Sequence, residues 1–99
     1  MPSFADNIRQ AVREGRYVIG DHADLRLTTR GIMDWQVVEG LESSRLLLER
    51  DDGIPHPVAE FEQLLADGTP IKAVWAWISH KQIAKLVTVH FFPRMDSWN

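Results

Sequence analysis

Apolar side chains in the N-terminal part of the chain recur with the period of an amphipathic helix. They occupy positions i, i+4, i+7 and i+8 of one segment, namely Phe4, Ile8, Ala11 and Val12. That spacing places them on one helix face. Ser3 precedes them and can accept a hydrogen bond from the first turn, while Gly15 is typical of a helix end. The pattern predicts a first helix between Ser3 and Gly15.

The next residues predict a short strand and a second helix. The segment 16–20, RYVIG, is apolar enough for a strand but too short to be more than a bridge between helices. Asp21 is suited to an N-cap, and Asp24 follows in the first turn. We therefore expect a helix over 22–30 that ends at the glycine after it.

A third helix is predicted after Asp34, again because aspartate is a good capping residue. Its expected buried side carries the apolar residues Trp35, Val38 and Leu41. The helix should end near Ser43. The N-terminal part of the chain is thus predicted to be mainly helical.

In the C-terminal half the apolar pattern becomes that of strands. A short strand is predicted at 45–50, RLLLER, and a turn at the DDG that follows. The segment 58–68, VAEFEQLLADG, fits both a helix and a strand. We favour a strand, because the sequence DGTP at its end is typical of a hairpin that leads into 71–80. That strand is rich in β-branched and aromatic residues, and a last strand over 83–92 should end at Pro93.

This order of elements predicts an α+β fold. The order is one helix, a short strand, two helices and then four strands that form a meander. This places N-terminal helices on one face of a four-stranded antiparallel sheet. The 99 residues are 44% hydrophobic, which is enough for one domain over 1–99 with a single core.

Charge is distributed unevenly along the chain. The net charge is −3, and this balance argues against a general nucleic-acid binder. Residues 1–30 hold five arginines against four acids, residues 31–70 two arginines against nine acids, and residues 71–99 three lysines and one arginine against one aspartate. The ends therefore carry net charges of +1 and +3 around a middle of −7. We expect the two ends to form a basic patch together.

Several classes of protein and site are not expected. The sequence has no cysteine, which excludes disulfides and thiolate metal sites. None of its four histidines has the His-x-His or His-x-x-x-His spacing of common metal sites. The longest apolar run, AVWAWI, has six residues against roughly 20 for a membrane span, and the first residues lack the pattern of a signal peptide. We expect a cytoplasmic protein without a metal or cofactor.

Candidate chemistry is concentrated in the second predicted helix. His22, Arg26 and Arg30 are spaced four residues apart, which aligns one imidazole and two guanidinium groups along one side of a helix. Histidine exchanges protons near neutral pH, and arginine matches the oxygens of a phosphate. The same spacing also occurs on solvated helix faces, where these arginines would pair weakly with Asp24 or Asp34. Both interpretations stay open.

His90, in the last predicted strand, is the fourth candidate. Alternation separates Ala84, Leu86, Thr88, His90 and Phe92 from Ile83, Lys85, Val87, Val89 and Phe91. We expect the second set to face the core, and His90 with Thr88 to face the less apolar side. A histidine satisfied within the sheet is the alternative. Trp75 and Trp77 share a strand face, where core packing is expected rather than base stacking.

Several of these motifs together resemble a bacterial family of small proteins, domain-of-unknown-function family 4258. The motifs are YVIGDHADLRLTTRGI, MDWQVVEGL, GIPHP and VTVHFFP, which lie between about residues 16 and 93. In this resemblance His22, Arg26 and Arg30 correspond to the histidine and the two arginines of the family. The chain departs from the family at Thr29, where an acid is common.

The resemblance implies a fold and an activity. The family is grouped by fold with RelE and barnase-like ribonucleases, which include the toxins of toxin–antitoxin pairs. This implies a metal-independent ribonuclease or RNA-binding protein with a site at His22, Arg26, Arg30 and His90, and with RNA or an antitoxin-like protein as its partner. His90 stands where the family more often has tyrosine, which argues against tyrosine-based chemistry. The alternative is a non-catalytic protein-interaction module of the same fold, binding through a sheet edge or the acidic segment 39–62.

Overall fold

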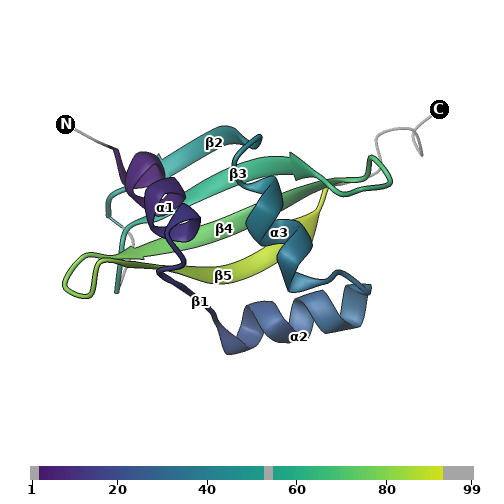
Figure 1. Ribbon diagram of the computed structural model, residues 1–99, viewed down its shortest axis with the longest axis horizontal. Helices are drawn as coiled ribbons and strands as arrows, with labels where there is room; N and C mark the ends of the chain where they lie inside the picture. The colour runs from purple at the N-terminus through teal and green to yellow at the C-terminus, as the bar shows by residue number, and fades with distance from the viewer. Residues whose placement is uncertain (1–2, 53–54, 93–99) are drawn as a thin grey trace.

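The computed structural model describes residues 3–52 and 55–92, and these contain three helices and five strands (Figure 1). The helices are α1 (Phe4–Arg13), α2 (Asp21–Arg30) and α3 (Asp34–Gly40). The strands are β1 (Tyr17–Ile19), β2 (Arg45–Arg50), β3 (Val58–Leu64), β4 (Pro70–Ile78) and β5 (Ile83–Phe91). The predicted α+β class is confirmed. Gly53 of the predicted DDG turn and Pro93 at the predicted end of the last strand lie outside the described residues.

The sheet has five strands in the order β1-β5-β4-β3-β2. Strands β2 to β5 form the predicted antiparallel meander, so the segment that fitted both a helix and a strand is a strand. The prediction of four antiparallel strands is wrong in one respect. The short strand β1 pairs in parallel with β5, with Tyr17 opposite Ala84 and Ile19 opposite Leu86. Three residues are enough for this pairing, because β1 follows only the first half of β5 before the chain enters α2.

Two helices cover one face of the sheet, and the third lies along its edge (Figure 1). Helix α1 packs on β4 and β5, helix α3 contacts β3, and α2 contacts β5. The core between helices and sheet contains the fully buried side chains of Ile8, Val37, Leu41, Phe61, Ile71, Trp75, Leu86 and Val89. No helix of the described residues packs on the opposite side of the sheet, which we call the open face. Alternation and register place on it the side chains of Val58, Glu60, Glu62, Lys72, Val74, Ala76, Lys85, Thr88 and His90.

The predicted ends of the first helix and of the β3–β4 hairpin are confirmed. Ser3 Oγ accepts a hydrogen bond of 3.2 Å from the N–H of Asp6, and Gly15 after α1 has φ of +80°. In the hairpin the N–H of Thr69 donates to Asp67 Oδ1 at 2.9 Å. Gly68 beside it has φ of +88°, a conformation that glycine adopts without strain.

Asp21 and Asp34 are not the N-caps that the sequence predicts. Each is the first residue of its helix, and the N-caps are Gly20 and Met33. The N–H of Gly20 donates to the carbonyl oxygen of Leu86 at 2.9 Å, and a Cβ atom at this position would lie 2.9 Å from the same oxygen. The close approach of α2 to β5 therefore requires glycine. The two aspartates lie in the first turn, where a negative charge is also favourable.

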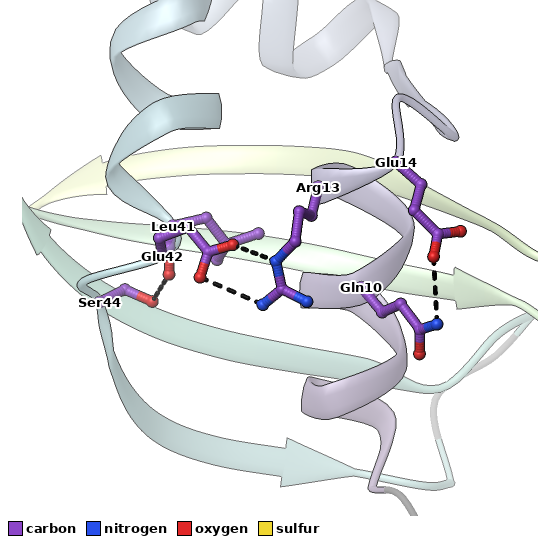
Figure 2. Close-up of polar contacts among 6 residues, drawn as sticks. All are labelled: Gln10, Arg13, Glu14, Leu41, Glu42 and Ser44. Carbon is purple, nitrogen blue, oxygen red and sulfur yellow. Dashed lines mark hydrogen bonds and ion pairs between the residues drawn. The ribbon is translucent and has the colours of Figure 1, made fainter.

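Polar contacts connect α1 with the turn that follows α3. Figure 2 shows the guanidinium of Arg13 with its Nε 2.5 Å from Glu42 Oε1 and its Nη2 3.2 Å from Oε2. Both side chains are exposed, so this ion pair adds little stability. Ser44 Oγ donates to the carbonyl oxygen of Leu41 at 2.6 Å and closes the turn that begins where α3 ends.

Strand β5 changes its buried side at a β-bulge. The pairing with β4 shifts by one residue between Val74 and Trp75, which leaves Val87 as the extra residue. The buried residues of β5 are Ala84, Leu86 and Val89. The prediction that Ile83 and Lys85 face the core is therefore wrong, because they precede the bulge. The prediction that Val89 faces the core is correct, because it follows the bulge. The prediction that Thr88 and His90 face away from the core is confirmed.

The tryptophans of β4 are core residues, as predicted. Trp75 is 0% exposed and Trp77 is 5% exposed. Trp35, which the sequence predicts on the buried side of α3, is 54% exposed, so this prediction is wrong. The buried side of this short helix is formed by Val37 together with Leu41 after it, and Trp35 lies on a different side.

Candidate functional site

The three site residues that the sequence predicts on α2 lie in one line along this helix, which packs beside β5. His22 lies in its first turn, Arg26 in the middle and Arg30 in its last turn. The helix is anchored by Ala23 and Leu27, which are 0% and 2% exposed. Because β1 occupies the edge of β5 only as far as Leu86, the second half of β5 is free to be lined by α2. His22 and Arg30 are exposed, whereas Arg26 is half-buried.

Arg26 and His90 are in direct contact. Arg26 Nη2 lies 3.2 Å from His90 Nδ1. A guanidinium group has only donors, so His90 Nδ1 accepts this hydrogen bond and the proton of the neutral ring is on Nε2. His90 therefore presents an N–H group to its surroundings, while its other nitrogen is not free to take a proton. In this arrangement His90 is a hydrogen-bond donor to an anion rather than a general base.

The pKa of His90 is lowered below its ordinary value. Burial, which disfavours the charged ring, is the largest cause, and the positive charges of Lys72, Arg26, Arg30 and His22 add to it. On α2, Arg26 contacts His90 directly, and His22 and Arg30 lie about one helical turn to either side of Arg26. We call these five residues, His22, Arg26, Arg30, Lys72 and His90, the basic stripe.

Arg30 lies at the end of the stripe beside β5. Its guanidinium carbon is 4.7 Å from the centre of the Phe91 ring, which is within the range of a cation–π contact. Neither Arg26 nor Arg30 forms an ion pair with any described residue. The alternative in which these arginines pair with Asp24 or Asp34 on a solvated helix face is therefore not what the described residues show.

The sequence patterns did not single out Lys72, Lys85 or Glu60. Lys72 lies directly opposite His90 in the register of β4 and β5. Glu60 is only 8% exposed, and its carboxylate lies 3.4 Å from Lys72 Nζ and also pairs with Arg50. The feature of the sequence that could have indicated Lys72 and Lys85 is the net charge of +3 over residues 71–99. The expected separation from the acidic middle is incomplete, because Glu60 of that middle lies on the same face.

A cavity of about 340 Å³ lies on the open face at the His22 end of the stripe. Its polar lining includes His22, His56 and Lys85. A second hollow, of about 380 Å³, lies between α1 and α3. The second hollow contains none of the predicted site residues. A third hollow, of about 280 Å³, is lined by Arg30 and Phe91 at the other end of the stripe, so the cavity on the open face is the one that adjoins His22.

No protein-family model, curated protein or solved structure is significantly similar to the chain. Among residues 3–52 and 55–92, no helix is long and apolar enough to cross a membrane. In that part of the chain, no three His, Asp or Glu side chains are grouped as ligands for a metal ion.

The lowered pKa of His90 predicts a pH dependence of stability. Below about pH 6.5, the ordinary pKa of histidine, the unfolded chain binds a proton at His90 while the folded protein does not. The free energy of unfolding is therefore expected to fall as the pH decreases from about 6.5 through the lower pKa of the folded state. Urea denaturation at about pH 7.5 and about pH 5 measures this loss.

The His90→Gln variant is the control for this pH dependence. Glutamine has no titration in this range, and all other histidines are present in both proteins. The wild type should lose more stability than the variant between the two pH values. Equal losses in both proteins would show that His90 titrates normally in the folded state.

Proposed function

We propose that this protein binds RNA and holds phosphate groups of the strand between α2 and the open face of the sheet. The contact of Arg26 with His90 is the observation that supports this most. The guanidinium of Arg26 donates to Nδ1 of His90, whose N–H is then on Nε2. Lys72 lies opposite His90 in the strand register, and Arg30 lies over the ring of Phe91 next to it. The proposal includes membership of family 4258 and a RelE-like fold, and hence a role related to that of toxin ribonucleases.

The chemistry of the basic stripe is suited to a phosphodiester. A phosphate oxygen only accepts hydrogen bonds, and the planar fork of arginine and the Nε2–H of His90 are both donors. Burial and the neighbouring cations favour the neutral ring of His90. The hydrogen bond from Arg26 orients it, so the ring offers its donor without a change of protonation. The overall charge of −3 does not oppose this function, because phosphate contact depends on the local field.

The salt dependence of RNA affinity tests this proposal. For a single strand, the logarithm of the binding constant falls with the logarithm of the salt concentration by about 0.7 for each phosphate contact. Contacts to about three phosphates should therefore weaken binding of a short oligouridylate about tenfold between about 50 and about 150 mM salt. Fluorescence anisotropy measures this affinity. A binding constant that is the same at both concentrations would contradict phosphate contact.

Cleavage of the bound RNA without metal is the catalytic form of this proposal. Because Arg26 occupies Nδ1 of His90, His22 is the imidazole suited to take a proton. It would accept the proton of a ribose 2′-hydroxyl as that oxygen attacks the adjacent phosphorus. Arg26 and Arg30 would hold the non-bridging oxygens. The bond to the 5′-oxygen then breaks, that oxygen takes a proton from water, and the strand ends in a 2′,3′-cyclic phosphate.

The His22→Ala variant tests the catalytic form. Loss of a general base lowers a rate by about 10² to 10⁴, so we expect RNA cleavage in the presence of a chelator to fall by at least about a hundredfold. Gel electrophoresis of labelled RNA measures the rate. The melting temperature should change little, because His22 is exposed. Cleavage that is unaffected by the substitution would assign the proton transfer to another group.

The edge strand β2 favours a second candidate function, that of a protein-interaction module. β2 is the outermost strand of the sheet order, and Leu46, Leu47 and Leu48 on it are 39%, 36% and 46% exposed. An unpaired edge with apolar side chains is a template for pairing with another strand. The partner in this case is a second copy of the chain, whose own β2 edge would pair with this one. This function would give a dimer in sedimentation experiments and no measurable RNA binding at low salt.

A further inference from the structure

The cavity on the open face has the composition of a site for a flat, partly apolar group. Its floor is formed by apolar side chains, Val58, Ala76 and Val87, and its polar lining by Asp21, His22, His56 and Lys85. Its volume of about 340 Å³ lies within the range of about 300–1,000 Å³ that is usual for small-molecule sites. The polar groups of the lining are thus two imidazole rings, one ammonium group and one carboxylate, whereas the floor offers no charge. An aromatic heterocycle fits this division better than a bare phosphate.

His56 gives the cavity an aromatic wall of defined orientation. Its ring is stacked on His80, with ring centres 6.1 Å apart and an angle of 29° between the planes. The segment that carries it is attached to β4, because the N–H of Trp77 donates to the carbonyl oxygen of Pro57 at 2.9 Å. His56 is half-buried. Histidine rings are among the side chains on which unpaired bases stack in RNA complexes.

The cavity and the basic stripe share His22. The stripe runs from this residue along α2 to Arg30, and the cavity lies on the open face at its beginning. A strand that lies along the stripe from Arg30 to His22 therefore reaches the cavity. Lys85 at the rim is a donor for the carbonyl oxygen or ring nitrogen of a base.

We propose that the cavity receives one unpaired nucleobase of the RNA strand that the stripe holds. This inference rests on the proposed function and makes it more specific. The ligand class is a single-stranded nucleotide, with its phosphate on the stripe, its base on the ring of His56 and an edge of the base toward Lys85. Binding then depends on the base as well as on charge.

Two chains of equal length and charge separate the base from the phosphate. One is a hexameric oligouridylate, and the other is the same ribose-phosphate chain without bases. At equal salt we expect the wild type to bind the uridylate at least tenfold more tightly, measured by competition in fluorescence anisotropy. Equal affinity for both chains would overturn the base site and leave phosphate binding intact. Failure of both chains to bind at low salt would overturn the proposed function, and the base site with it.

Two variants localise the base within the cavity. Ala76→Leu fills the apolar floor, and His56→Ala removes the stacking ring without filling space. Each should reduce the preference for the uridylate at least threefold and leave the affinity for the abasic chain unchanged. The same substitution at Ala66, an exposed turn residue that lines the hollow at the Arg30 end of the stripe and not the cavity, should leave the preference for bases unchanged. If Ala76→Leu does not fold, as judged by its melting curve, His56→Ala decides the matter. A preference that persists in every folded variant would place the base elsewhere and overturn the inference.

Discussion

Replacement of Arg26 by alanine is expected to weaken the binding of single-stranded RNA by at least about tenfold. A hydrogen bond to a charged group contributes about 1.5–3 kcal/mol, and about 1.4 kcal/mol corresponds to a factor of ten in affinity. The substitution also removes the hydrogen bond to Nδ1 of His90. The proton of the neutral ring is then no longer fixed on Nε2. The salt dependence should become shallower by about 0.7 for each phosphate contact that is lost. Anisotropy titrations at several salt concentrations measure both effects.

Arg13→Ala is the matched control for this experiment. Arg13 is an exposed arginine on α1, where it pairs with Glu42 on the helix-covered side of the sheet (Figure 2). Its loss lowers the net charge by the same amount but removes no group of the basic stripe. The control should bind RNA as the wild type does. Equal weakening in both variants would mean that RNA responds to the overall charge and not to the site on α2.

Arg26→Lys separates charge from geometry at the same position. Lysine keeps the positive charge but has no planar fork. We expect an affinity between those of the wild type and of Arg26→Ala, with the salt dependence of the wild type.

The features that the sequence predicts well are those determined by residues close to one another in the chain. The capping of α1 by Ser3 and the hairpin at Asp67 depend on contacts within three residues. The alignment of His22, Arg26 and Arg30 is likewise a property of one helix. Such features follow from the dihedral preferences and hydrogen-bonding groups of the residues involved, and they are confirmed.

The features that the sequence does not predict depend on pairing between distant segments. The bulge at Val87 is set by how β5 fits β4, and it reverses which side of β5 is buried. The N-cap at Gly20 results from the close approach of α2 to Leu86. The position of Lys72 opposite His90 is a consequence of strand register. Local periodicity contains none of this information, so the cationic partners contributed by the sheet could not be identified from it.

The largest loss of stability is expected for Trp75→Ala. Trp75 is fully buried, and its ring meets that of Tyr17 edge-on, with centres 6.3 Å apart and planes at 80°. Truncation of a buried tryptophan costs about 3–5 kcal/mol, which is a large part of the 5–15 kcal/mol typical of a whole domain. The melting temperature should fall by at least about 12 °C. Urea denaturation gives the free energy of unfolding, and Trp35→Ala, at an exposed tryptophan, should change it by no more than about 0.5 kcal/mol.

Trp75→Phe distinguishes packing from polarity at the same position. The indole Nε1 of Trp75 is buried and has no hydrogen-bond partner among the described residues, so phenylalanine keeps an aromatic ring and removes an unsatisfied donor. We expect it to cost less than half as much stability as alanine. A cost equal to that of alanine would mean that the indole N–H is satisfied by bound water. Because the ring faces the helices and not the open face, Trp75→Phe should bind RNA with wild-type affinity, which separates the stability of the sheet from the chemistry of the basic stripe.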